Sequence, residues 1–163
     1  MATQLPVKID LTLPEGWQPA PPDEVGAPEA AFVALRLPAD DGFTTNITVS
    51  GAIRDDGATL EAIADESVGR LSGSVGEVDV LTRAAAGTEE APSYTQTLRV
   101  AAELDGAHRE LIQCQVYLEM RDDDLPAERA VIELVLTSTV GGFEDFVGEF
   151  QEFVRSVVPA GAG

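Results

Sequence analysis

The side chains on which most enzymes depend are scarce in this chain of 163 residues. It contains one histidine, His108, one cysteine, Cys114, and one lysine, Lys8. General acid-base catalysis most often uses histidine, and covalent catalysis needs a serine, cysteine or lysine within hydrogen-bond reach of a base. The phosphate loop Gly-x-x-x-x-Gly-Lys, the dinucleotide motif Gly-x-Gly-x-x-Gly and the hydrolase motif Gly-x-Ser-x-Gly are absent from the sequence. The residues therefore predict a protein that is not an enzyme and that has no cofactor.

None of the remaining candidate groups predicts a reactive or metal-binding site. Cys114 alternates with apolar residues on one strand face, where a thiol behaves as a small inert hydrophobe. The acidic run Asp122-Asp123-Asp124 with Glu128 lacks the spacing of a calcium loop, so we interpret it as a solvated hairpin loop. His108 is alone and should be exposed beside a turn, so no metal site is predicted.

The charge balance excludes several kinds of partner. The chain has 29 acidic residues against 10 basic ones and a formal net charge of -19, which repels phosphate backbones and anionic lipid surfaces at long range. We therefore expect no nucleic-acid partner and no stable membrane association. The sequence shows no signal-peptide pattern, and its single cysteine cannot form an internal disulfide, so a cytoplasmic location is expected. The acidic surface fits either ordinary solubility or salt adaptation.

Hydropathy alternation predicts seven strands and two amphipathic helices. The strands are expected at Val7–Leu13, Ala31–Leu37, Phe43–Gly51, Val78–Thr82, Tyr94–Ala102, Ile112–Met120 and Arg129–Thr139. One helix is expected to follow an N-cap at Thr59 and to carry an apolar stripe as far as Leu71, and the other to span Phe143 to Val157. We expect a Pro-rich loop at 18–28, a mobile loop at Ala84–Pro92 and a flexible tail at 158–163.

The order of these elements predicts an α+β fold. An antiparallel sheet of about six to seven strands should carry the helices, and the last three strands should form a meander. A length of 163 residues suits one domain, 1–163. The Phe-rich stripe of the last helix should pack on the apolar face of the sheet.

The register of the two longest strands decides which of their side chains share a face. A two-residue Asp105-Gly106 loop would place Leu98 opposite Gln113, whereas a three-residue loop ending with Gly106 in the left-handed conformation would place Leu98 opposite Ile112. We predict the three-residue loop, because it gives Leu98 and Ile112 a common apolar face.

In that register a polar surface with little charge forms on the opposite face. It consists of Thr95, Thr97, Arg99, Gln113, Gln115 and Tyr117. Tyrosine and arginine contribute disproportionately to binding at protein interfaces, so we expect this surface to bind a partner, with Arg99 and Tyr117 as solvent-accessible anchors. The alternative is an ordinary solvent face or a face covered by the first helix. If that face is covered, the residues around Trp17 become the better candidate.

Several short motifs resemble a known family. They are a strand leading into Leu13-Pro14-Glu15-Gly16-Trp17, a Pro-rich loop, the strand Thr45-Asn46-Ile47-Thr48-Val49, an acidic helix, a three-strand meander and a terminal aromatic helix. In this order they resemble the actinobacterial LpqN/LpqT proteins of the MOG/PsbP-like fold. The resemblance implies an antiparallel sheet flanked by helices, no catalytic residues, and membership of a superfamily of assembly factors, binding partners and secretion chaperones. The mycobacterial relatives carry a signal peptide and a lipid-modified cysteine that this sequence lacks, so a cytoplasmic paralogue is implied.

These observations lead to two functional hypotheses of different classes. The first is a non-catalytic cytoplasmic protein-binding module, a chaperone or adaptor for another polypeptide. The alternative is an enzyme or a small-ligand binder that uses a pocket between sheet and helix.

Overall fold

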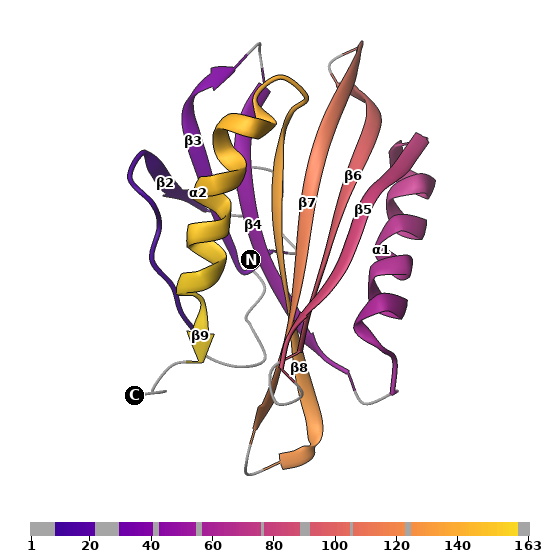
Figure 1. Cartoon of the computed structure of the whole chain (residues 1–163). Coiled ribbons are helices and arrows are strands. Elements are labelled where there is room, and N and C mark those ends of the chain that lie inside the picture. The colour runs from indigo at the N-terminus through magenta and orange to yellow at the C-terminus, as the bar shows by residue number, and fades with distance from the viewer. Residues whose placement is uncertain are drawn as a thin grey trace.

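A seven-stranded antiparallel sheet carries one helix on each of its faces (Figure 1). The computed structural model describes residues 9–21, 30–40, 43–54, 57–75, 77–88, 92–104, 106–122 and 125–159. The strands are β1 (Ile9–Asp10), β2 (Trp17–Ala20), β3 (Phe32–Asp40), β4 (Phe43–Ile53), β5 (Glu77–Gly87), β6 (Pro92–Leu104), β7 (Ala107–Asp122), β8 (Leu125–Thr139) and β9 (Val158–Pro159). The helices are α1 (Leu60–Val75) and α2 (Phe143–Ser156). This is the α+β architecture that the sequence predicts.

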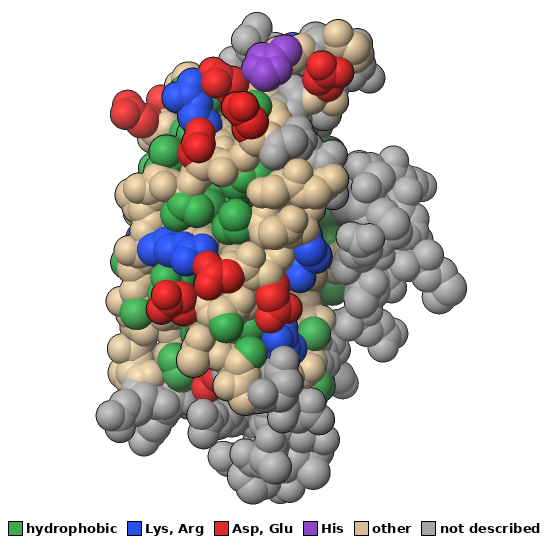
Figure 2. Space-filling view, turned by 90° about the vertical axis from the view of Figure 1, so that its right-hand side faces the viewer, with side chains coloured by type: hydrophobic (Ala, Val, Ile, Leu, Met, Phe, Trp, Pro, Cys, Tyr) green, Lys and Arg blue, Asp and Glu red, His purple; other side chains and the backbone are tan. Residues whose placement is uncertain are grey.

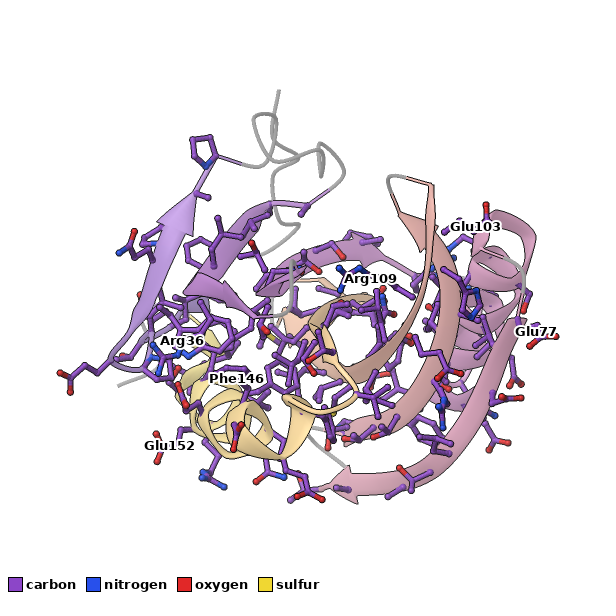
Figure 3. The ribbon with its side chains drawn as sticks, turned by 90° about the horizontal axis from the view of Figure 1, so that it is seen from above. Arg36, Glu77, Glu103, Arg109, Phe146 and Glu152 are labelled. Atoms are coloured by element: carbon purple, nitrogen blue, oxygen red, sulfur yellow. The ribbon has the colours of Figure 1, made fainter. Side chains whose placement is uncertain are left out.

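The strand order of the main sheet is β2-β3-β4-β8-β7-β6-β5, and every neighbouring pair is antiparallel. The predicted hairpin of β3 and β4 and the predicted meander of β6, β7 and β8 are both present. The pairing of β4 with β8 joins the two halves of the sheet and runs from Asn46 opposite Thr137 to Ile53 opposite Ala130. The two helices lie toward opposite ends of the sheet, on opposite sides of it (Figure 3).

The main core lies between α2 and the centre of the sheet. Alternate residues of β4, β7 and β8, such as Ile47, Cys114 and Leu136, share the face on which α2 packs. Phe150 and Phe153 of α2 are fully buried against them. Complete burial of one such side chain contributes about 1.5 to 3 kcal/mol, so these two rings account for much of the docking of α2.

On the other face, α1 begins where the sequence predicts. The Oγ1 atom of Thr59 accepts a hydrogen bond of 3.1 Å from the N–H of Ala62, which satisfies one of the N–H groups that lack an intrahelical partner in the first turn. The buried side of α1 includes Leu60 and Ile63. Ser67 lies on the same side of the helix and is also buried, so this packing face is not purely apolar.

The terminal segments differ from the prediction. Only Ile9–Asp10 of the first predicted strand is described as a strand, and it pairs with β9, Val158–Pro159, instead of joining the main sheet. Two residues of the predicted flexible tail are therefore held in a ladder. Residues 1–8 and 160–163 lie outside the described part of the chain.

The predicted Pro-rich loop also contains a strand. Trp17–Ala20 forms β2 and pairs with β3, with Trp17 opposite Arg36. An edge strand tolerates Pro19, because a proline disrupts a sheet only where its missing N–H would have to bond to a neighbouring strand. Residues 22–28 of the predicted loop lie outside the described residues.

The loop predicted at Ala84–Pro92 is in part a strand as well. Ala84, Ala85 and Ala86 continue β5 and pair with β6 as far as Gly87 opposite Pro92. Alanine and glycine are poor strand formers alone, but the neighbouring strand supplies the ladder, so composition was a weak guide here.

The predicted register of β6 and β7 is wrong. Leu104 lies opposite Ala107, so only two residues connect the strands, and Leu98 lies opposite Gln113. Gly106 does adopt the left-handed conformation, with φ of 79°, as a two-residue hairpin also requires. The prediction assumed uniformly apolar and polar faces, whereas the real face mixes leucine with glutamines that bond to one another.

Candidate functional site

Beside α1, part of the sheet face on which this helix packs forms an open groove. α1 packs mainly on β5, β6 and β7, and the groove runs from its side over β7, β8 and β4. It has a volume of about 630 Å³. Its lining residues, which we call the α1 groove, are Asn46, Thr48, Ser67, Arg70, Leu71, Gln113, Gln115, Glu133, Val135 and Thr137.

The α1 groove is polar but carries little charge. Arg70 and Glu133 are the charged residues of its lining, and the other polar residues there are amides and hydroxyls. The same two residues also line a smaller hollow of about 160 Å³ that adjoins the groove next to Tyr117. In a chain of net charge -19, a surface with one carboxyl group differs clearly from the average surface.

A buried hydrogen-bond network fixes the floor of the groove to α1. Gln96 donates from Nε2 to Gln115 Oε1 (2.7 Å) and to the main-chain oxygen of Ala64 in α1 (3.1 Å). Gln115 in turn donates to Gln113 Oε1 (3.0 Å). Gln96 and Gln115 are almost fully buried, and buried polar side chains that are satisfied in this way specify one arrangement of helix and sheet.

Tyr117 connects this network to the charged pair of the groove. Its hydroxyl lies 2.7 Å from Gln115 Oε1, 2.7 Å from Ser67 Oγ and 3.5 Å from Glu133 Oε1. Arg70 donates to Ser67 Oγ over 3.1 Å. The groove is therefore lined by side chains with few alternative positions.

Burial changes the acidity of two groups at this point. It raises the pKa of the Glu133 carboxyl, while the positive charge of Arg70 and the Tyr117 hydroxyl act in the opposite direction. Burial, together with the negative charge of Glu133, raises the pKa of the Tyr117 hydroxyl well above its usual value. Tyr117 is thus a neutral phenol at physiological pH.

The described contacts of Ser67 do not form a nucleophile–base pair. A serine nucleophile needs a general base within hydrogen-bond reach. The contacts of Ser67 Oγ are the Tyr117 hydroxyl and the Arg70 guanidinium, and neither group is a base at neutral pH. Glu133 contacts Tyr117 but is not hydrogen-bonded to a hydroxyl that could act as a nucleophile in the described part of the chain.

The six side chains predicted to form one polar surface lie on two different faces. Gln113, Gln115 and Tyr117 face α1, whereas Thr95, Thr97 and Arg99 lie on the α2 side of the sheet. Tyr117 is 0% exposed, so the predicted accessibility of this anchor is wrong. The correct register separates the two sets, because a shift of one residue moves every side chain of a strand to the other face.

Arg99 and the two threonines lie on β6, next to the strands on which α2 packs. α2 packs on β7 and β8, and Arg99 lies farther along, on β6. Its guanidinium forms a hydrogen-bonded ion pair with Glu110, and Asp79 on β5 lies opposite it. Arg99 is thus partly exposed but already neutralised.

Trp17, the second-choice candidate, is a structural residue. It is 6% exposed, its indole N–H donates to Glu149 Oε1 over 2.8 Å, and its ring meets Phe146 edge-on at 6.2 Å between centroids. The guanidinium of Arg36 lies 5.7 Å from the Phe146 centroid and bonds to the carbonyl of Gly16. Gly16 has φ of 95° and closely approaches Arg36, so the Pro14-Glu15-Gly16-Trp17 turn anchors β2 to α2.

Cys114 and His108 lie as the sequence predicts. Cys114 is buried, and burial raises the pKa of its thiol, while His108 is exposed as expected. Among the described residues, no group of three or more His, Cys, Asp or Glu side chains is placed to hold a metal ion. Glu128 lies in β8 and not in the predicted acidic loop. Asp123, Asp124 and the side chains of Asp122 and Glu128 lie outside the described part of the chain. Neither described helix has the length and apolar character needed to cross a membrane.

Sequence reasoning missed several residues of the groove. Asn46, Thr48 and Thr137 alternate with buried apolar residues, so their period-two pattern marked them as one face of a strand, but only the pairing of β4 with β8 brings them together. Ser67 interrupts the apolar stripe of α1, and Arg70 follows one turn later. A polar residue on an otherwise apolar stripe was the available signal for this contact.

No family model matches the chain, and no curated protein sequence matches it. Several solved structures are similar. LpqN of Mycobacterium tuberculosis, described as involved in cell envelope biogenesis, is 14% identical with a TM-score of 0.65, over 94% of this chain and 86% of that chain. The cyanobacterial PsbP (CyanoP) of Synechocystis is 16% identical with a TM-score of 0.59, over 93% of this chain and 86% of that chain. The Ran-binding protein Mog1p of Saccharomyces cerevisiae is 14% identical with a TM-score of 0.56, over 96% of both chains.

These likenesses show the fold. The chain has the MOG/PsbP-like arrangement of a seven-stranded antiparallel sheet with two helices, as the resemblance in its sequence implied. No sequence match supports an actinobacterial origin. Fold similarity at such identities does not transfer a function.

Proposed function

We propose that this chain is a non-catalytic module that binds another polypeptide in the α1 groove. One observation carries the proposal: an open hollow of about 630 Å³ in a very acidic chain is lined by amides and hydroxyls, with Arg70 and Glu133 as its charged residues. Interfaces between proteins are poor in carboxylates and combine polar with aliphatic surface. Leu71 and Val135 supply the aliphatic part.

The amide side chains favour a polypeptide as the occupant. A carboxamide offers a donor and an acceptor side by side, as a peptide group does. Gln113 on β7 and Asn46 on β4 lie on either side of Thr137 on β8, so they face the groove across three adjacent strands. An extended segment laid across these strands would meet such groups at successive positions, and its main chain would be recognised with little demand on its side chains.

The rigidity of the floor supports the same proposal. Contrary to the prediction, Gln115 and Tyr117 are buried. They hold Gln113 and Ser67 in place through the buried network. A site that is ordered before binding loses less conformational entropy when the partner arrives.

The fold also supports a protein partner. Mog1p, which shares it, is described as a Ran-binding protein, so the fold is compatible with a protein partner. A chaperone or adaptor role in the cytoplasm is part of the proposal. The single buried cysteine is compatible with a reducing compartment.

The proposal can be tested by filling the groove. Thr48→Arg places a long charged side chain in the α1 groove, and Gln151→Arg makes the same change of charge on the exposed side of α2. Both variants should keep the melting temperature of the wild type. A partner captured from the native organism should bind Thr48→Arg more weakly by about 1 to 3 kcal/mol and should bind Gln151→Arg normally. Equal binding to all three proteins would show that the groove is not the partner site.

A small polar ligand is the second candidate for the same groove. The volume of about 630 Å³ falls within the roughly 300 to 1,000 Å³ that small-molecule sites occupy, and Arg70 beside Glu133 could hold a polar headgroup. Such a ligand would raise the melting temperature of the purified wild type in a screen of metabolites and would have no effect on Thr48→Arg. A polypeptide partner predicts no such response to small molecules.

A further inference from the structure

The two edges of the main sheet differ strongly in length and composition. β2, at one edge, has four residues and includes Pro19. β5, at the other edge, has eleven residues, Glu77–Gly87, and contains neither proline nor lysine. An edge strand presents a row of main-chain N–H and C=O groups, and short length, proline and lysine are the usual protection against further pairing. β5 has none of these three features, and its protection is limited to the register shift between Val80 and Thr82 and to the charges of Glu77, Asp79 and Arg83.

The second half of β5 is the regular part of that edge. The ladder with β6 shifts register between Val80 and Thr82 and then continues without interruption from Thr82 opposite Thr97 to Gly87 opposite Pro92. Ala84, Ala85 and Ala86 are exposed, and their small side chains leave the main chain accessible. Val80 and Leu81, at the register shift, are exposed large apolar residues at 42% and 51%.

The surroundings of this edge are acidic. Glu77 and Asp79 are exposed on β5, and Figure 3 shows Glu77 pointing away from the sheet at its outer side. α1 adds Glu61 and Asp65 near the same strand, and Asp65 forms a 2.7 Å ion pair with Arg83 of β5. Acidic side chains outnumber Lys and Arg on this side of the molecule (Figure 2). A strand added here therefore gains electrostatically if it carries positive charge.

We propose that the edge of β5 binds an extended basic segment of a partner protein as an additional strand of the sheet. Main-chain hydrogen bonds along Thr82–Gly87 would hold one half of the segment. Its other half would continue past the register shift, where basic side chains at alternate positions would lie beside Glu77 and Asp79, which share one face of β5. This surface is separate from the α1 groove. The inference rests on the proposed function only in that the partner is a polypeptide.

A second copy of the chain is a poorer occupant of the same edge. Each copy has a formal net charge of -19, so two β5 edges would bring two acidic surfaces together. The register shift near Leu81 would also lie close to the centre of a self-paired ladder and would disrupt it from both sides.

The test uses a short synthetic peptide in which arginine and valine alternate, and a control peptide with glutamate in place of arginine. The arginine peptide should bind the full chain and slow hydrogen–deuterium exchange in β5, while the glutamate peptide should do neither. Asp79→Asn and Glu77→Gln should each weaken binding by about two- to fivefold, the range expected for exposed charge pairs. Glu144→Gln, the same change in the first turn of α2, should leave binding unchanged.

Proline substitutions show whether main-chain pairing is used. Successive residues of an edge strand alternate in pointing their N–H toward the neighbouring strand or away from the sheet, so Ala84→Pro and Ala85→Pro affect opposite sides. The variant that keeps the wild-type melting temperature has lost an outward N–H and should lose at least tenfold in peptide affinity.

Three results would overturn the inference. They are normal binding by the stable proline variant, equal binding of the glutamate peptide, and a dimer that forms without peptide and protects the same β5 amides. Thr48→Arg should bind the arginine peptide normally, so a failure of the edge and a failure of the α1 groove would be told apart.

Discussion

Glu133 is the carboxyl group of the α1 groove, and its protonation depends on folding. Burial raises its pKa above the ordinary value of 4.5. The unfolded chain therefore loses this proton at a lower pH than the folded chain does, and stability present at low pH is lost as the pH rises from the ordinary pKa through the folded one. The carboxyl of Glu133 thus opposes folding once the pH exceeds its ordinary pKa.

Replacing this carboxyl by an amide should remove the pH-dependent cost. Glu133→Gln should raise the melting temperature relative to the wild type, and the difference should be larger at pH 7 than at pH 4. Thermal unfolding followed by circular dichroism at both pH values measures it, with Glu144→Gln on the exposed side of α2 as the control. A difference that is equal at both pH values would mean that Glu133 titrates normally.

Cys114 is expected to be unreactive. It is 6% exposed, and burial raises the pKa of its thiol although Thr97 partly opposes this. Because the thiolate is the nucleophile, the folded protein should react with a maleimide at pH 7 far more slowly than the urea-unfolded protein. Comparable rates for the two states would show that the strand face around Cys114 opens readily.

At the scale of elements, the docking of α2 is the largest single contribution that can be tested. Phe150 is fully buried in the core between α2 and the sheet. Phe150→Ala should lower the free energy of unfolding by about 3 to 5 kcal/mol, because it leaves a cavity among residues that cannot close around it. Urea denaturation measures this, and Glu152→Ala on the exposed side should change stability by less than about 0.5 kcal/mol. A loss below about 1 kcal/mol would mean that α2 is not docked as described.

The same elements show what the sequence could and could not predict. Period-two alternation was sufficient for β3, β4 and the β6–β8 meander, and helical spacing with Thr59 and the Phe stripe located both helices. These signals are local. The strand at Ala84–Ala86 depends on a partner strand, and the β1–β9 pair joins residues from the two ends of the sequence, so neither pairing follows from local alternation.

The candidate site was predictable in composition but not in position. Gln113 and Gln115 were identified as unusual polar strand residues and do line the groove. The other residues of the predicted polar surface were assigned to it by the register of β6 and β7. Because the loop between these strands is one residue shorter than predicted, Arg99 was assigned to the wrong face. Register depends on side-chain contacts such as the hydrogen bond between Gln96 and Gln115. Such contacts cannot be predicted from hydropathy.

At the scale of the molecule, each helix covers a different part of the sheet. α1 packs on β5 to β7 from one side, and α2 packs on β7 and β8 from the other. A sheet of seven strands is wider than one helix, which is about 10 to 12 Å in diameter. The fold therefore leaves open both the α1 groove over β4 and β8 and the outer edge at β5, so two separate binding surfaces are compatible with one core.

The net charge of -19 should make stability depend on salt. Two electrostatic effects compete, since added salt weakens ion pairs but also screens repulsion among the acidic side chains. The described ion pairs, Arg36–Glu149, Arg54–Glu66, Arg83–Asp65 and Arg99–Glu110, involve partly exposed side chains and are each worth at most about 1 kcal/mol. Raising the ionic strength from about 0.01 M to about 0.15 M shortens the screening length from about 30 Å to about 8 Å, so repulsion across the whole surface is reduced.

We therefore expect the melting temperature to rise with sodium chloride over this range. A gain of about 1 kcal/mol corresponds to about 2 to 4 °C for a domain of this size. The effect should be smaller at pH 4, where many carboxylates are protonated and the repulsion is already reduced. A melting temperature that falls with salt at pH 7 would mean instead that the local ion pairs of α1, β5 and β6 outweigh the repulsion of the acidic surface.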